Sequence, residues 1–97
     1  MQISVKKVLF EIPHIQLAQL ESDEYCLIVE DTELNDLVED FLWDEYVYES
    51  TFVSSEGRDK PAIYFNTFGA GLPVEGLIER LRAINQVEVE SIFRKNN

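Results

Sequence analysis

Carboxylates dominate the residues of this chain that could do chemistry. Twelve of them fall between Glu21 and Glu49, and no Lys, Arg or His lies among them. A pair of carboxylates can serve as general acid and base, and a larger group can bind basic side chains. Because so many carboxylates crowd this segment, no pair stands out as catalytic. We expect the segment to bind a partner rather than to catalyse a reaction.

His14 and Cys26 are the remaining candidates for nucleophilic or metal chemistry, and each is the single residue of its type. No spacing connects them. Cys26 lies in an apolar run, which predicts a buried structural thiol, and His14 follows Pro13, which predicts a surface imidazole. The chain also lacks the CxxC, HExxH and calcium-loop spacings of metal sites. The sequence therefore predicts no catalytic residue, no metal and no cofactor, and we expect the protein not to be an enzyme.

The charge of the chain limits its partners. Nineteen Asp and Glu against eight Lys and Arg give a formal net charge of −11 at pH 7. Such a charge repels nucleic acids and anionic membranes, so we expect neither as a direct ligand. A basic protein, either a toxin or a nucleic-acid-binding protein, is the partner that this charge favours.

Apolar runs are short throughout the sequence. None approaches the roughly 20 residues that span a bilayer, and the N-terminus lacks the apolar core of a signal peptide. A lone cysteine allows no intrachain disulfide. We therefore expect a soluble, cytoplasmic protein, present as a monomer or a dimer.

The segment 32–44 places its apolar residues at helical spacing and predicts a helix, with Asp31 or Thr32 as the N-cap. Asp36, Asp40 and Asp44 then occupy successive i,i+4 positions on the face opposite the apolar residues. Two further acids lie beside them, and two aromatic residues of the kinds enriched at interface hot spots follow. The predicted partner-binding residues are Glu33, Asp36, Glu39, Asp40, Asp44, Tyr46 and Tyr48.

This carboxylate stripe has an energetic cost. Repulsion between neighbours and the unfavourable helix dipole together cost on the order of 1–2 kcal/mol, out of a total stability of roughly 5–15 kcal/mol. Lys at Asp40 or Asp44 would increase stability. The stripe is therefore interpreted as a partner surface; the alternative is a solvated face that serves only solubility.

The elements that position the stripe are predicted from periodicity. Residues 2–12 read as a strand with a bulge at Lys6-Lys7, where the alternation changes phase. Residues 13–24 fit neither period and are taken as a connection. Residues 24–31 contain a run of apolar residues typical of a central, buried strand.

The second half of the chain predicts a hairpin, a helix and a strand. Aromatic and β-branched residues favour an antiparallel pair at 46–54 and 61–68. Residues 73–85 predict a helix with Pro73 in its first turn. Val87 and Val89 alternate and predict a last strand at 86–96. The whole chain, residues 1–97, is then a single α+β domain with the order β-β-α-β-β-α-β. Its last six elements give a ferredoxin-like sandwich with two helices on one face of a mostly antiparallel sheet.

In size, acidity and lack of a catalytic signature, the chain resembles the small immunity and antitoxin proteins that bacteria pair with basic nuclease toxins. The resemblance is one of profile over the whole chain and includes no aligned residues. It implies an inhibitor that neutralises a basic toxin through the carboxylate-rich helix.

Three alternatives stay open. One is a subunit or scaffold protein that forms oligomers through an open sheet edge. The stripe could mimic DNA and occupy the nucleic-acid site of a DNA-binding protein. The chain could instead be a small ligand-sensing or regulatory βαββαβ dimer, in which the loop from Gly69 to Gly71 would bind a metabolite.

Overall fold

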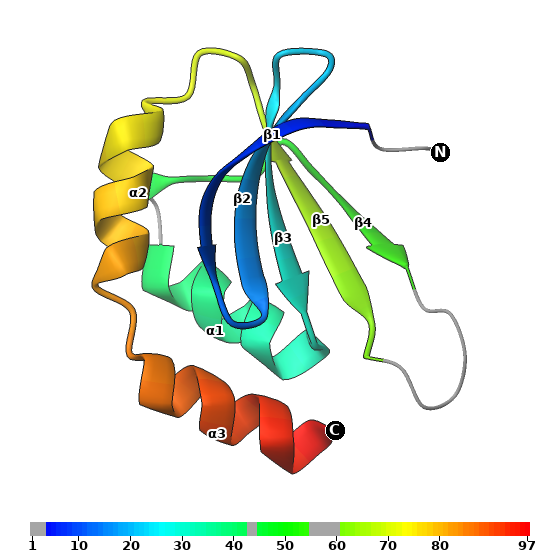
Figure 1. Ribbon diagram of the computed structural model, residues 1–97, viewed down its shortest axis with the longest axis vertical. Coiled ribbons are helices and arrows are strands. Elements are labelled where there is room, and N and C mark those ends of the chain that lie inside the picture. The colour runs from blue at the N-terminus through cyan, green and yellow to red at the C-terminus, as the bar shows by residue number, and fades with distance from the viewer. Residues whose placement is uncertain (1–3, 43–44, 55–60) are drawn as a thin grey trace.

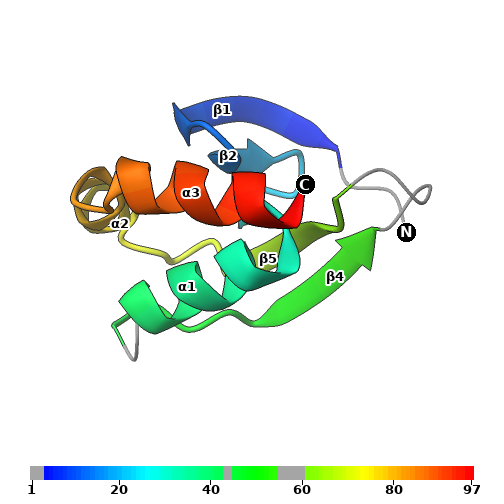
Figure 2. The same ribbon diagram turned by 90° about the horizontal axis from the view of Figure 1, so that it is seen from below.

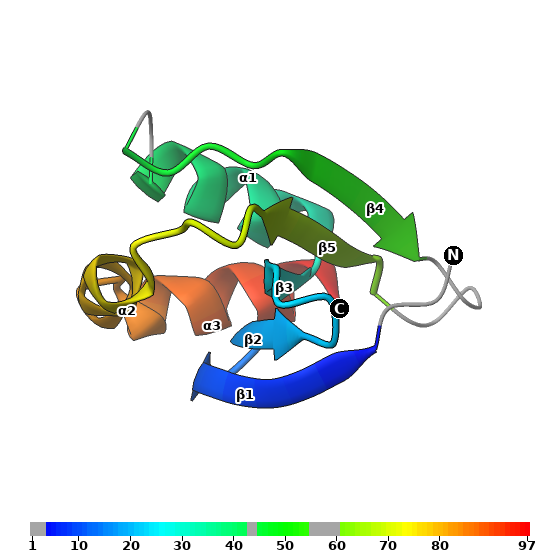
Figure 3. The same cartoon turned by 90° about the horizontal axis from the view of Figure 1, so that it is seen from above.

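The computed structural model describes residues 4–42, 45–54 and 61–97 of the chain (Figure 1). Within these residues five strands form one antiparallel sheet, in the order β1-β2-β3-β5-β4, and three helices lie on one side of it (Figures 2 and 3). The predicted α+β class is therefore confirmed. The strands are β1 (Val5–Ile12), β2 (Ile15–Leu20), β3 (Tyr25–Glu30), β4 (Ser50–Ser54) and β5 (Ile63–Phe68).

Strand β1 is irregular at the place where its sequence changes phase. Its register on β2 shifts between Val5 and Lys7, and again between Val8 and Phe10. The bulge predicted at Lys6-Lys7 is thus confirmed. Bulges bend a strand and increase its twist, and Figure 1 shows β1 curving across the sheet.

Strand β2 lies within residues 13–24, so the prediction of a connection there is wrong. β2 pairs with β1 on one side and with β3 on the other. Its neighbouring residues Leu17 and Ala18 point to opposite faces of the sheet, yet both are 0% exposed. A strand that is covered on both faces has no polar alternation, and this explains why the periodicity is absent.

The central strand and the following pair agree with prediction. β3 is the middle strand of the sheet, and β4 and β5 are antiparallel neighbours. The turn predicted between them, residues 55–60, lies outside the described residues. Because β3 and β4 are both antiparallel to β5, β5 runs between two strands that are parallel to each other.

The two predicted helices are present. Helix α1 extends over Thr32–Leu42, and residues 43–44 of the prediction lie outside the described part. Helix α2 extends over Val74–Arg82, and Pro73 is its N-cap rather than a residue of its first turn. Neither these helices nor the third, described next, is long and apolar enough to cross a bilayer.

Residues 86–96 form a helix, α3 (Gln86–Asn96), and the predicted last strand is wrong. The Asn85 side chain caps this helix by accepting a hydrogen bond from the backbone nitrogen of Glu88. Val87 is 81% exposed, whereas Val89 is buried. The apolar residues of α3 that face the core are therefore Val89, Ile92 and Phe93, at helical spacing.

These differences change the topology. The observed order is β-β-β-α-β-β-α-α, and the flank of β3 away from β5 is occupied by β2. The predicted ferredoxin-like order is therefore not found. In the described part of the chain three helices rather than two pack on the sheet, and the core lies between sheet and helices. Its fully buried members include Ile15, Leu17, Leu27, Val29, Leu34, Val38, Leu42, Leu77, Leu81 and Val89.

Candidate functional site

Helix α1 places its acids as the apolar spacing requires. Leu34 and Val38 are 0% exposed and face the core, and Asp36, Glu39 and Asp40 are exposed. Within the described residues no basic side chain forms an ion pair with these three carboxylates. We call Asp36, Glu39 and Asp40 the acidic face of α1. Asp44, which was predicted to extend it, lies outside the described residues.

The start of α1 is held by a buried aspartate. Asp31 is 6% exposed and has a φ of 96°, a left-handed conformation that Asp tolerates better than most side chains. Its Oδ2 atom accepts a hydrogen bond from the backbone nitrogen of Leu34 at 3.1 Å. Asp31 rather than Thr32 is therefore the N-cap of the helix.

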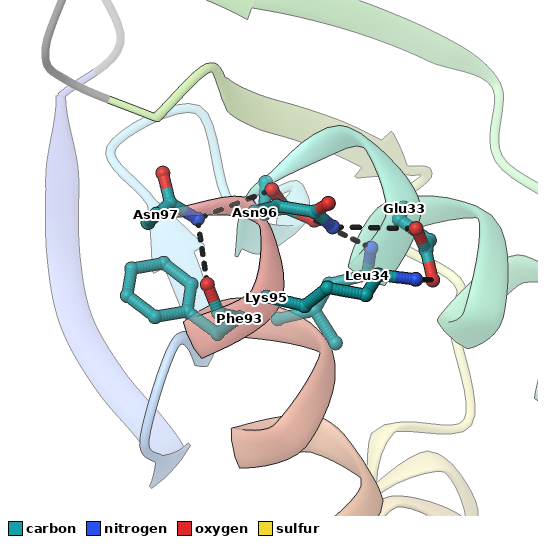
Figure 4. A network of polar contacts seen from close by, with 7 residues as sticks. Glu33, Leu34, Phe93, Lys95, Asn96 and Asn97 are labelled. Carbon is teal, nitrogen blue, oxygen red and sulfur yellow. Dashed lines mark hydrogen bonds and ion pairs between the residues drawn. The ribbon is translucent and has the colours of Figure 1, made fainter.

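The C-terminal end of α3 reinforces this cap (Figure 4). The side-chain amide of Asn96 donates to Asp31 Oδ2 at 3.3 Å, and that of Asn97 donates to Asp31 Oδ1 at 3.2 Å. Lys95 Nζ lies 3.0 Å from Glu33 Oε2, and Asn96 also donates to Glu33. These hydrogen bonds, that from Lys95 first, hold the pKa of Glu33 below its usual value. Glu33 is thus paired within the chain and differs from the acidic face.

A cation from α2 lies at the other end of α1. Arg80 Nη2 donates to the Phe41 carbonyl oxygen at 3.0 Å, and the guanidinium lies 4.4 Å from the centre of the Phe41 ring. Arg80 Nε is also 3.9 Å from Glu45 Oε2, a distance too long for a hydrogen bond. Positive charge at a helix C-terminus offsets the helix dipole. Arg80 therefore compensates part of the cost of the acids on α1, which has no basic residue in its own last turn.

One side of the acidic face borders the β4 edge of the sheet. Asn35 on α1 accepts a hydrogen bond from buried Asn66 on β5, and Asn66 in turn accepts one from Thr51 on β4. Glu39 follows Asn35 by four residues, so it lies on the same side of the helix. β4 ends the sheet, and its Val53 is 56% exposed. The side of α1 that carries Glu39 therefore faces the β5-β4 end of the sheet, and exposed Val53 is opposite Tyr64, whose hydroxyl contacts Thr32 at the start of the helix.

The two tyrosines of the predicted site pack against the core. Tyr48 packs edge-on against Phe68 with ring centres 5.2 Å apart, and both Tyr46 and Tyr48 are half-buried against the core. Burial, and secondarily the Glu39 carboxylate, raises the pKa of Tyr48. Its hydroxyl has no hydrogen-bond partner among the described residues. Of the two tyrosines, Tyr48 is thus near Glu39 of the acidic face. Its ring also packs against the core.

His14 and Cys26 lie apart, because His14 is beside Glu30 at the end of β3 and Cys26 is near the start of that strand. Cys26 is 0% exposed on β3, and burial raises the pKa of its thiol to about 11. His14 is less exposed than predicted: its ring stacks on Phe93 at 3.5 Å, and its Nε2 atom lies 2.9 Å from Glu90 Oε1. The sequence pattern did not predict this contact. Phe93 and Glu90 belong to α3, a segment that the alternation of Val87 and Val89 had predicted as a strand.

In the described part of the chain, no group of three or more His, Cys, Asp or Glu side chains is arranged to hold a metal ion. No family model, curated protein or solved structure matches the chain at a significant level. The site is therefore interpreted from its own geometry.

Proposed function

We propose that this chain is a non-enzymatic binding protein that presents the acidic face of α1 to a basic protein, as an immunity or antitoxin protein presents acids to a nuclease toxin. One observation supports the proposal above all others. Asp36, Glu39 and Asp40 are exposed without an ion pair in the described residues, whereas described cations such as Arg80 and Lys95 contact other groups.

The acidic face would act in two stages. Its field would steer a basic partner toward α1 and raise the association rate, an effect that salt screens over a Debye length of about 8–10 Å. Contact would then desolvate a few carboxylates against Arg or Lys, which would fix the register and slow release. Val53, exposed on the edge strand β4, would supply non-polar contact area near the start of α1.

The test is capture of a basic partner from host lysate at low and at high salt, with the wild-type chain and two charge-matched variants as bait. Asp36→Lys/Asp40→Lys reverses two exposed acids at i,i+4 spacing on α1. Glu75→Lys/Glu79→Lys makes the same change in net charge at two exposed acids on α2. We expect the α1 variant alone to lose the partner. Equal capture by both variants would show that α1 is not the contact surface.

The same experiment separates the two kinds of basic partner. If the captured protein is released by competing duplex DNA, α1 acts as a DNA mimic on a nucleic-acid site. If DNA has no effect and the partner's toxic activity is blocked, the chain is a toxin inhibitor. The proposal includes a cytoplasmic location, which is compatible with the single, buried and free thiol of Cys26.

A second candidate function is a regulatory dimer formed through the sheet. None of the described helices covers the outer face, where Val8 is 49% and Phe52 36% exposed and where Phe65 and Ile28 are half-buried. Apolar side chains on an open sheet face favour self-association. Sedimentation at micromolar concentration tests it: a monomer excludes this candidate, and a stable dimer that binds no basic protein would replace the first proposal.

A further inference from the structure

A cavity of about 240 Å³ opens beside the turn between β1 and β2. Gln16 on β2, Ile28 and Glu30 on β3, and Ile63 on β5 line it. In the sheet register Gln16 is opposite Ile28, and Glu30 is opposite Ile63, while the neighbouring pair of Leu17 and Leu27 faces the helices. Side chains alternate between the faces of a sheet. The cavity therefore lies at the end of the sheet, with these four side chains on the face turned away from the helices, while His14, which also lines it, contacts α3.

The polar lining of the cavity is built of acceptors. Glu11 and Glu30 contribute carboxylates, and among the described residues no Lys or Arg lines the cavity. The Gln16 amide donates to Glu11 Oε2 at 2.7 Å and holds that carboxylate in place. The Glu30 side chain is 42% exposed, so a ligand that enters from solvent can contact its carboxylate.

His14 adds an acceptor when its imidazole is neutral, and the contact of one ring nitrogen determines which nitrogen accepts. An ionised carboxylate only accepts hydrogen bonds, so His14 Nε2, 2.9 Å from Glu90 Oε1, must be the donor. In the neutral imidazole the opposite nitrogen, Nδ1, is then an acceptor. It lies 3.8 Å from Glu30 Oε1, too far for a hydrogen bond between the two. A single donor group that lies to one side of this pair can be within hydrogen-bond distance of both acceptors.

We propose that this cavity binds a primary ammonium group on an unbranched aliphatic stem, the chemistry of a lysine side chain. An ammonium group has three donors and a compact charge, which suits separate acceptors such as His14 Nδ1 and Glu30, whereas a guanidinium prefers one carboxylate in its plane. Ile28 and Ile63 supply an apolar wall for the stem. The volume is below the roughly 300–1,000 Å³ of sites for drug-sized ligands, so it suits a single side chain. The site is independent of the proposed function of α1.

The test is an amide NMR titration of the isotope-labelled chain with n-butylammonium. We expect saturable shifts at Gln16, Ile28 and Ile63, and none at α1. Butanol, which has the same stem without the charge, should cause no saturable shift, and butylguanidinium should bind more weakly. Saturation by butanol, stronger binding of the guanidinium, or no localised shift with n-butylammonium would overturn the proposal.

Substitutions test whether binding depends on the two carboxylates of the cavity or only on the net negative charge of the chain. Glu30→Gln and Glu11→Gln should each weaken n-butylammonium binding by about tenfold, because a charged acceptor is replaced by a neutral one. Glu79→Gln removes the same charge from exposed α2 and should leave binding unchanged. An equal loss in all three variants, or none in the first two, would contradict the site. Well-dispersed amide spectra of the variants verify that they fold.

A second titration, with a lysine derivative, tests whether the ammonium group comes from a protein or from a small molecule. N-acetyl-lysine-N-methylamide carries the same group on a peptide backbone. If it binds as tightly as n-butylammonium or more so, the cavity accepts a lysine of a protein. If the free amine alone binds, the cavity accepts a small-molecule amine, and the ammonium chemistry still holds. If neither saturates, the proposal is wrong.

Discussion

Asp31 and Asn97 are joined by a hydrogen bond of 3.2 Å from the Asn97 amide nitrogen to Asp31 Oδ1, which ties the C-terminal end of α3 to the first residue before α1. The same carboxylate accepts from the Leu34 backbone through its other oxygen. One buried side chain therefore both caps the acidic helix and fixes it to α3. The orientation of the candidate site depends on a helix that lies more than fifty residues later in the sequence.

Replacing Asp31 tests this double role. Asp31→Ala removes the cap and both amide contacts and places Ala at a φ of 96°, so we expect a loss of about 1–2 kcal/mol in the free energy of unfolding. Asp31→Asn keeps an accepting oxygen and a side chain that tolerates this conformation, and should lose far less. Urea denaturation measures both. Equal losses would show that the charge, rather than the cap, is what stabilises the helix.

The contact between Glu33 and Lys95 predicts a dependence on pH. The pKa of Glu33 is lowered from 4.5 in the folded chain, so the stabilisation it provides is complete above pH 4.5 and is lost as the pH falls through the lower, folded value. Glu33→Gln should therefore be less stable than wild type at neutral pH, and the two should converge in acid. Asp36→Asn, at an exposed acid without an ion pair in the described residues, should show no such loss at neutral pH. A wild-type advantage that persisted in acid would contradict the pairing.

Several elements, including the helix of the site, were predictable because each leaves a local signal. The bulge at Lys6-Lys7 shifts the phase of an alternation, and the run at 26–29 is too apolar for an edge strand. The acids of α1 lie opposite Leu34 and Val38, as the helical spacing requires. In these cases the residues that define the element are also its neighbours in sequence.

The missed elements show where local signals fail. β2 is covered on both faces, so it has no polar period, and α3 begins with two valines that imitate a strand. The capping pair of Asn85 and Glu88, three residues apart, was the sequence signal that favoured a helix. The stacking of His14 on Phe93 had no local signal at all, because 76 residues separate His14 from Glu90 of the same helix. Contacts of this kind follow from tertiary packing alone.

Substitutions in α3 distinguish the observed helix from the predicted strand. Phe93→Ala removes the ring that stacks on His14 and packs against the core, and we expect a loss of about 2 kcal/mol. Val89→Ala should cost about 1–2 kcal/mol, because Val89 is 1% exposed. Val87→Ala, at a position 81% exposed, should change stability by less than about 0.5 kcal/mol. In the predicted strand Val87 and Val89 share one face, so similar losses at both would support the strand.

The acidic face of α1 implies a balance between stability and binding that one substitution can test. Asp40→Lys removes repulsion with Asp36, creates an Asp-to-Lys pair at i,i+4 spacing, and places a cation near the helix C-terminus. The free energy of unfolding should rise by about 0.5 kcal/mol, measured by urea denaturation. If the face binds a basic partner, the same variant should associate with it more slowly at low salt and approach the wild-type rate at high salt, because screening removes the difference. A more stable chain that binds less well is the result expected when carboxylates are kept for a partner. A variant that gains stability and keeps its association rate would show that the acids serve only solubility.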